Sequence, residues 1–215
     1  MSVFRKFRDT HDVRACERYG VLGSMGVPPA VADAICAGPR RSAGKFTFKA
    51  ADSNGDAEIL IYEFIGYDWW TDSGMTAKQF ADELKNLGNV QRLTVRINSP
   101  GGDVWDGMSI FNMLSQYQAT TTVVIEGIAA SVASVIAMAG DSVKAAELSQ
   151  IMIHDSWTIA MGNEQQLREL ADVLAKIDTQ IAEVYAKRSG KSEDYFRELQ
   201  NKDTYLTAAE AKDIG

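Results

Sequence analysis

The alternation of apolar and polar residues predicts a series of short strands from residue 46 onward. In these segments β-branched and aromatic residues recur at every second position or run together, which is typical of strands in a sheet. Clusters of glycine, asparagine and aspartate lie between them and indicate turns. The predicted strands are 46–50, 58–65, 93–98, 121–125 and 150–154.

Apolar residues spaced three or four apart predict helices between these strands. Thr76 and Gln79 have the form of a capping box and predict a helix that runs to about residue 87. Further helices are predicted over 103–117 and from near Ser131. The inward faces of the first two are formed by Phe80, Leu84 and Leu87, and by Ile110, Met113 and Leu114. Strands that alternate with helices in this way indicate an α/β domain built from βα units.

The longest predicted helix runs from Asn163 to about Lys187. Its apolar residues are spaced alternately three and four apart, which makes a heptad seam. A seam of this kind either packs inside its own domain or docks against another subunit, and the pattern leaves both alternatives open. The seam consists of Leu167, Leu170, Leu174, Ile177, Ile181 and Val184.

The first 45 residues differ from the rest of the chain in charge and in the residues that interrupt regular structure. They carry eight Lys/Arg and four Asp/Glu, whereas residues 46–215 carry 14 and 25. Proline and glycine interrupt the segment at 26–29 and 38–41. We therefore expect two parts: a basic N-terminal arm or propeptide-like segment over 1–45, and one folded domain over 46–215.

Composition narrows the class of protein. The chain has 215 residues, of which 46% are apolar, so it can bury a core without disulfide bonds. Its net charge of −7 argues against nucleic acid as a partner. The two cysteines, Cys16 and Cys36, cannot form a disulfide framework. The longest uncharged run, 127–140, is shorter than the roughly 20 residues of a membrane-spanning helix. We expect a cytoplasmic protein without a membrane partner.

Ser131 is a candidate nucleophile. It follows a predicted strand and Gly127, and it begins a helix of small residues. A hydroxyl at that position faces unpaired backbone N–H groups and the positive end of the helix dipole, which suits developing negative charge. The same position is also typical of an ordinary serine N-cap. The local residues alone leave nucleophile and cap as alternatives.

Two further segments contain residues suited to catalysis. Gly101 and Gly102 connect a strand to a helix, and paired glycines free the backbone to present N–H groups to an oxyanion. Phosphate is disfavoured because no Gly-Lys-Ser/Thr follows. His154 ends an apolar strand, and the other histidine, His11, lies in the predicted arm. A histidine in that place is either a base or a satisfied structural residue.

Residues 52–63 carry acidic and polar side chains at several positions of an EF-hand calcium loop. Ala57 stands where the loop requires glycine, and the segment before residue 52 alternates like a strand instead of a helix. The alternative is a hairpin turned at Asn54-Gly55. We therefore expect the hairpin, and no metal or other cofactor.

Several motifs occur together in a characteristic order. They are Ile-Asn-Ser-Pro-Gly-Gly at 97–102, Gly-Met-Ser-Ile-Phe at 107–111, the segment around Ser131, Ile-Met-Ile-His at 151–154 and Leu-Thr-Ala-Ala-Glu-Ala at 206–211. In this order and spacing the chain resembles the Clp protease proteolytic subunit (ClpP, the S14 serine peptidases) over roughly 57–215. It is most similar to the ClpP-related head maturation proteases of tailed phages and prophages.

The resemblance implies an α/β fold, the ClpP/crotonase-like spiral of ββα units with a protruding handle helix. It also implies a serine endopeptidase with a Ser-His-Asp mechanism. Ser131 would attack the scissile carbonyl, and His154 would take its proton and later give it to the leaving amine. The backbone N–H groups of Gly102 and Val132 would hold the oxyanion.

The third triad residue is assigned by the same resemblance. In the family the orienting aspartate follows the handle helix and precedes the segment that corresponds to 206–211. Asp203 is the only acid between Leu199 and Leu206, so it is the expected residue. Asp194 is the alternative. If neither carboxylate reaches His154, the site is a Ser-His dyad or is inactive.

The resemblance further implies how substrate and partners bind. Gly101 and the stretch 157–162, with Trp157, Thr158 and Ile159, would pair with an extended substrate. Substrates would be unfolded polypeptides, or phage capsid or scaffold proteins if the chain is phage-encoded and works in the bacterial host cytoplasm.

The expected partner is the chain itself, in a heptameric ring or stacked rings held by the helical seam. An AAA+ ATPase partner is compatible with the resemblance, but no residue here supports one. Two other functions remain: a non-catalytic assembly protein with Ser131 as a helix cap, and a crotonase-type acyl-CoA enzyme.

Overall fold

The computed structural model describes residues 46–67 and 73–215, so the predicted arm, with its cysteines and His11, lies outside the described residues. The described elements follow the predicted alternation of strands and helices. The strands are β1 (Thr47–Lys49), β2 (Asp56–Ile61), β3 (Arg92–Ser99), β4 (Thr120–Ala130), β5 (Ser142–Ala145), β6 (Gln150–Ile153) and β7 (Thr204–Thr207). The helices are α3 (Ala77–Lys85), α4 (Val104–Ser115), α5 (Val132–Ala137), α6 (Glu164–Ser189), α7 (Glu193–Gln200) and α8 (Ala208–Ile214).

One sheet of seven strands organises the described residues. β1 pairs with β2 in antiparallel fashion, and β2, β3 and β4 then run parallel. The long strand β4 pairs with β5 along its first half and with β6 near its end, both in parallel. β7 is the last strand in the order of the sheet and pairs with β6 in antiparallel fashion. The carboxyl ends of β3, β4 and β6 therefore point in one direction.

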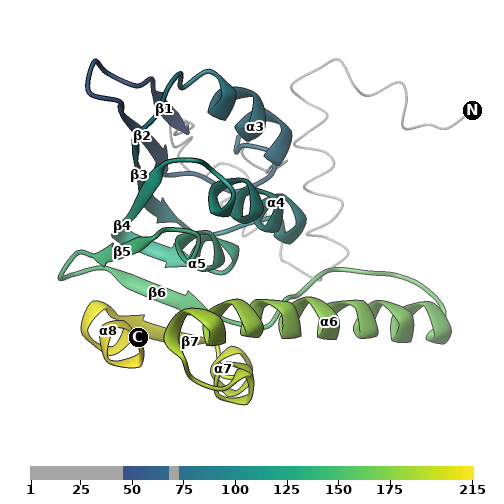
Figure 1. The fold of residues 1–215 in the computed structure, drawn as a ribbon. Helices are drawn as coiled ribbons and strands as arrows, with labels where there is room; N and C mark the ends of the chain where they lie inside the picture. Colours follow the sequence, from purple (N-terminus) through teal and green to yellow (C-terminus); the bar gives the residue numbers. More distant parts are fainter. Residues whose placement is uncertain (1–45, 68–72) are drawn as a thin grey trace, which may run out of the picture. The chain divides into compact units, whose positions relative to one another are not determined.

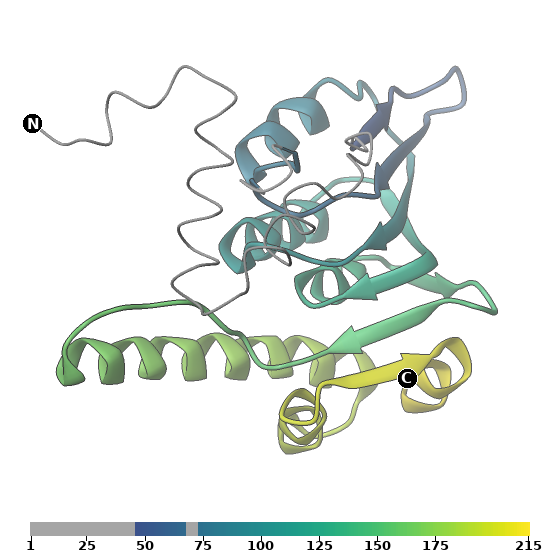
Figure 2. The ribbon, with the colours of Figure 1, turned by 180° about the vertical axis from the view of Figure 1, so that it is seen from behind.

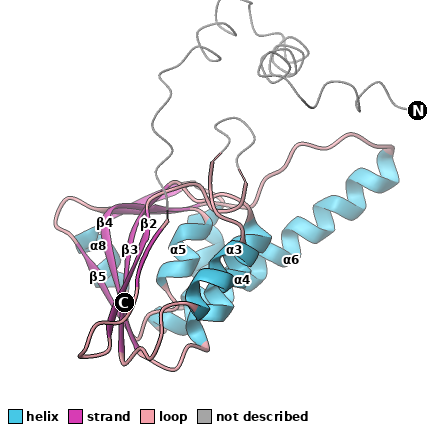
Figure 3. Ribbon diagram, turned by 90° about the horizontal axis from the view of Figure 1, so that it is seen from above, coloured by secondary structure: helices cyan, strands magenta, loops and turns pink. Residues whose placement is uncertain are grey.

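The core lies between this sheet and the helices α3, α4 and α5, which lie together on one face of it (Figures 1 and 3). Alternate residues of β3 are buried, and the buried set on that strand is Leu93, Val95, Ile97 and Ser99. The capping box predicted at Thr76 is present, and Phe80, Leu84 and Leu87 are buried as the spacing predicted. Burying one such large apolar side chain contributes about 1.5–3 kcal/mol.

The handle helix α6 extends beyond the sheet (Figure 2). A capping box between Asn163 and Gln166 begins it, and the left-handed Gly190 ends it. The burial of the predicted seam residues changes along the helix. Ile177 and Ile181 are buried within the domain, whereas Leu167 is 44% exposed. The C-terminal half of the helix thus packs inside its own domain, and the N-terminal half leaves Leu167 and Val173 exposed in the single chain.

The hairpin interpretation of residues 52–63 is confirmed. β1 and β2 pair in antiparallel fashion, with Phe48 opposite Ile59. In the connecting turn, an Asp52 carboxylate oxygen accepts the N–H groups of Asn54 and Asp56 at 2.8 and 3.0 Å. Gly55 adopts a positive φ of 76°, which a glycine reaches without strain. The Asp52 side chain, one of those that suggested calcium, therefore organises a turn.

Four elements were not among the predicted ones: β5, α7, β7 and α8. All are short, between four and eight residues.

Within residues 46–67 and 73–215, no helix is long and apolar enough to cross a bilayer.

Candidate active site

Three loops meet because three parallel strands end at the same edge of the sheet. β3 leads into Gly101 and Gly102, β4 leads into Ser131, and β6 leads into His154. The register shifts between Ile97 and Ser99, and this irregularity sets Ser99 beside Ala129. In open α/β sheets the crevice outside the carboxyl ends of the strands is where ligands bind. The topology thus brings together residues that lie far apart in the sequence.

Ser131 occupies a sharp turn between β4 and α5. Its backbone has φ 53° and ψ −132°, an unusual conformation for a residue other than glycine that costs about 1–3 kcal/mol. Its N–H donates to the carbonyl of Met152 at 2.9 Å, which ties the turn to β6. Although Ser131 is at the N-cap position, its side chain makes no capping hydrogen bond. The hydroxyl is therefore free for another partner.

That partner is His154. The Nε2 atom of His154 lies 2.7 Å from the Oγ atom of Ser131. Both residues are half-buried. A hydroxyl in hydrogen-bond contact with an imidazole is the arrangement in which the imidazole can remove the hydroxyl proton as the oxygen attacks.

The glycine loop packs directly against Ser131. A Cβ atom on Gly101 would lie 2.6 Å from the Ala130 carbonyl oxygen and 2.7 Å from the Ser131 Cβ atom. The loop is fixed by Ser99, whose Oγ accepts the Gly101 N–H at 3.1 Å, and by Ile65, whose N–H donates to the Gly101 carbonyl at 2.9 Å.

Two backbone donors are left without acceptors in this loop and in the turn beside it. Within the described part of the chain, neither the Gly102 N–H nor the Val132 N–H has a hydrogen-bond acceptor. Free N–H groups at such a turn are suited to hold an oxyanion.

Asp203 lies next to the residue that pairs with the end of β6. It immediately precedes Thr204, and Thr204 is the antiparallel partner of Ile153. Asp203 has a positive φ of 48° and is exposed. Among residues 46–67 and 73–215, no hydrogen bond links its carboxylate to His154. The alternative, Asp194, is exposed in the first turn of α7.

A charged network beside His154 was not predicted. The carboxylate of Asp155 accepts a hydrogen bond from Arg197 at 2.9 Å, and the N–H of Ser156 donates to Asp178 at 2.7 Å. Burial raises the pKa of Asp155, which Arg197 lowers in part. Asp178 and Arg197 lie on different helices, α6 and α7. No sequence spacing signals their contact, because it depends on how those helices pack.

A cleft of about 560 Å³ opens over the Ser131–His154 pair. Apolar side chains of α6 form one wall: Leu170, Val173, Leu174, Ile177 and Ile181. Of the predicted substrate residues, Trp157 and Thr158 line this cleft. Ile159 is 75% exposed and does not line it, and residues 157–162 form no strand in the single chain.

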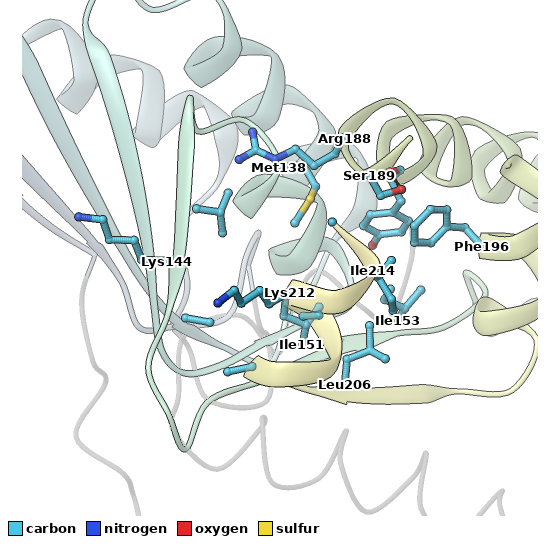
Figure 4. Close-up of a pocket in the computed structure, with 16 residues that line it drawn as sticks. Met138, Lys144, Ile151, Ile153, Arg188, Ser189, Phe196, Leu206, Lys212 and Ile214 are labelled. Carbon is cyan, nitrogen blue, oxygen red and sulfur yellow. Dashed lines mark hydrogen bonds between the residues drawn. The ribbon is translucent and has the colours of Figure 1, made fainter. Parts of the chain in front are cut away.

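A second cavity of about 510 Å³ lies among β5, β6, β7, α8 and the C-terminal end of α6. Ile151, Ile153 and Leu206 are among its apolar lining residues (Figure 4). It includes neither Ser131 nor His154. Tyr185 lines both cavities, and its hydroxyl lies 2.7 Å from that of Ser134. Burial raises the pKa of Tyr185, so this hydroxyl stays protonated.

Comparison with known proteins gives the family and the fold that this chain resembles. The sequence profile of the family described as Clp protease matches residues 73–215. The ATP-dependent Clp protease proteolytic subunit of Bacteroides fragilis is 32% identical over 145 residues, which are 65% of this chain and 70% of that protein. The subunit of the same name from Oltmannsiellopsis viridis is 32% identical over 125 residues, 57% of this chain and 64% of that protein.

A solved structure with a similar fold is that of a ClpP1 point mutant from Listeria monocytogenes. The TM-score is 0.63 at 25% sequence identity, and the match covers 74% of this chain and 86% of that chain. This likeness confirms the predicted fold class, an α/β sheet of ClpP type with a protruding helix.

Proposed function

Because the chain belongs to the Clp protease family and is a serine-type peptide hydrolase, we propose that it is an endopeptidase with Ser131 as nucleophile and His154 as base. The observation that carries the proposal is the 2.7 Å contact between the Ser131 Oγ and the His154 Nε2 atoms. The strained backbone of Ser131 supports it, since such strain clusters at active sites.

The proposed reaction proceeds in two halves. His154 accepts the hydroxyl proton as the Ser131 oxygen attacks the scissile carbonyl, and the N–H groups of Gly102 and Val132 stabilise the oxyanion. His154 then gives the proton to the leaving amine, and the C–N bond breaks to leave an acyl-enzyme. A water molecule, deprotonated by His154, releases the acid by the same steps in reverse. Asp203 is proposed to orient His154, with Asp194 as the alternative.

The second candidate, a non-catalytic assembly protein, assigns Ser131 the role of a helix cap. The missing capping hydrogen bond argues against that role. A crotonase-type acyl-CoA enzyme has no particular support from this site, where the serine faces a histidine.

The proposed substrates are extended polypeptides, including phage head or scaffold proteins. The cleft over Ser131 has a wall of apolar side chains from α6, which suits the exposed apolar side chains of an unfolded polypeptide. We further propose that copies of the chain assemble in rings, and that rings stack through the N-terminal half of α6, where Leu167 and Val173 are 44% and 40% exposed. A monomer in light scattering at working concentration would contradict this assembly.

The test of the catalytic proposal compares three variants in hydrolysis of a quenched fluorescent peptide. Ser131→Ala and His154→Ala should each abolish hydrolysis while leaving the far-UV circular dichroism unchanged. Ser142→Ala, an exposed serine in β5, is the matched control and should retain full activity. Full activity in Ser131→Ala or in His154→Ala would refute the assignment.

A further inference from the structure

The orientation of the His154 side chain depends on the backbone around it. Among the described residues, the imidazole has a hydrogen bond only to Ser131, the group it would deprotonate. On the N-terminal side, β6 is held between β4 and β7. Asp155 and Ser156 must therefore be fixed from elsewhere if the imidazole is to keep its direction.

Two helices supply that support. The N–H of Ser156 donates to the carboxylate of Asp178 on α6 at 2.7 Å, and Asp178 is only 5% exposed. The side-chain amide of Gln200 on α7 donates to the backbone carbonyl of Asp178 at 3.2 Å. Gln200 is itself fully buried. The chain just after His154 is thus anchored to a buried carboxylate that α7 holds in place.

Arg197 joins the parts of this support. Its Nη1 atom lies 2.9 Å from an Asp155 carboxylate oxygen, 3.3 Å from the Gln200 side-chain oxygen and 3.7 Å from the second Asp178 carboxylate oxygen. A buried carboxylate left without a cation is costly, so the guanidinium of Arg197 stabilises the Asp178 side chain that accepts the Ser156 N–H.

Acidic side chains near His154 come from three parts of the chain: the segment after β6, helix α6 and the turn before β7. Asp155 follows it in the chain, Asp178 of α6 accepts the N–H of Ser156 two residues after His154, and Asp203 precedes β7. Asp178 and Asp203 both act on Asp155, whose pKa is raised chiefly by burial. Tyr205 of β7 lines the same cleft. Among the described residues, Arg197 is the one cation in ion-pair contact with Asp155 and Asp178.

We propose that Arg197 is a positioning residue for the catalytic base, and this inference rests on the proposed function of His154. It fixes Asp155 and Asp178, and through them the segment that follows the imidazole. It also balances the negative charge next to that ring. Its removal should misplace the imidazole and favour the protonated imidazolium, which cannot accept the serine proton.

The test measures the rate at which a fluorophosphonate modifies Ser131 as a function of pH. Arg197→Met should lower the maximal rate about 10- to 100-fold. It should also move the pH midpoint upward by about 0.5–1 unit, because local negative charge favours imidazolium. Arg197→Lys should restore the midpoint and part of the rate. Arg168→Met removes an exposed arginine of α6 that pairs with Glu164, and should match the wild type.

A second variant should shift the pH midpoint of Ser131 modification in the opposite direction. Asp155→Asn keeps the shape of a side chain that is 34% exposed, so the fold should persist. It removes a negative charge beside His154, and the midpoint should fall. Opposite shifts in Arg197→Met and Asp155→Asn are the signature of charge balance, which a loss of folding stability does not produce.

The outcomes separate the inference from the function on which it rests. If the wild type reacts with the fluorophosphonate but neither variant moves the midpoint, Arg197 is only structural and the inference is wrong. If Arg197→Met does not fold, an unchanged midpoint in Asp155→Asn overturns the inference on its own. If the wild type does not react at all, the proposed nucleophile is refuted, and the role of Arg197 with it.

Discussion

Replacing Gly101 by alanine tests whether the glycine loop sets the position of the nucleophile. The new methyl group would lie 2.6 Å from the carbonyl oxygen of Ala130 and 2.7 Å from the Cβ atom of Ser131. Ordinary van der Waals contact begins at 3.4 Å, so the new methyl group and these neighbouring atoms must move apart by about 0.7 Å. Neither neighbour is the end of a flexible side chain. The movement must therefore displace Ser131 or the loop that carries the Gly102 N–H.

The size of the effect follows from that displacement. A misplacement near 1 Å in an active site costs about 100-fold in rate, so Gly101→Ala should slow peptide hydrolysis roughly 30- to 100-fold. Alanine at the φ of 93° also costs roughly 1–2 kcal/mol of folding stability. A loss of activity has to be separated from this second effect.

Gly88→Ala provides the matched control. Gly88 has a similar φ of 84°, but a Cβ atom there meets nothing within 4 Å. Both variants carry the cost of a left-handed alanine, and Gly101→Ala carries the cost of the steric overlap as well, so it should be the less stable of the two in thermal denaturation. At a temperature where both variants are folded, only Gly101→Ala should lose most of its activity. Hydrolysis by Gly101→Ala within threefold of that by Gly88→Ala would refute the argument that this loop positions Ser131.

Three further predictions concern stability. Phe80 is fully buried against two other phenylalanine rings, so Phe80→Ala should lower the free energy of unfolding by about 3–5 kcal/mol in urea titration; a loss below about 1 kcal/mol would contradict this packing. Asn163→Ala removes the cap of α6 and should cost about 1 kcal/mol; an unchanged thermal midpoint would show that the cap does not stabilise the helix. Hydrogen bonds from Lys49 and Arg96 hold the pKa of Glu58 below its ordinary 4.5. The stability that Glu58 contributes is therefore present at neutral pH and is lost as the pH falls through the lowered pKa. Wild type should be more stable than Glu58→Gln at neutral pH and converge with it in acid, and a difference that persists in acid would contradict this.

Local signals in the sequence predicted the elements whose cause is local. Thr76 and Asn163 each begin a helix with a capping box that four residues define. The Asn54-Gly55 turn likewise follows from its own residues. β5 was missed because Ser142–Ala145 has mixed polarity and is largely exposed, so no periodicity indicates it. Its pairing with β4 is a tertiary contact.

The candidate site also has features that the sequence predicted and features that depend on tertiary packing. The residue types at Ser131 and His154 suggested chemistry, and a family resemblance gave them roles, but only the shared direction of β4 and β6 explains why they meet. Asp203 could be named from its place before β7, yet whether it orients His154 stays a prediction. The contact of Arg197 with Asp155 links positions 42 residues apart through the packing of α7, which no local pattern encodes.

The most direct test of the central claim is the intact mass of the protein after treatment with a fluorophosphonate. Such reagents form a stable ester with a serine that a neighbouring base activates. We expect one adduct per chain in the wild type and none in Ser131→Ala. An adduct that persists in Ser131→Ala, or no adduct in either protein, would contradict the claim that Ser131 is the activated nucleophile.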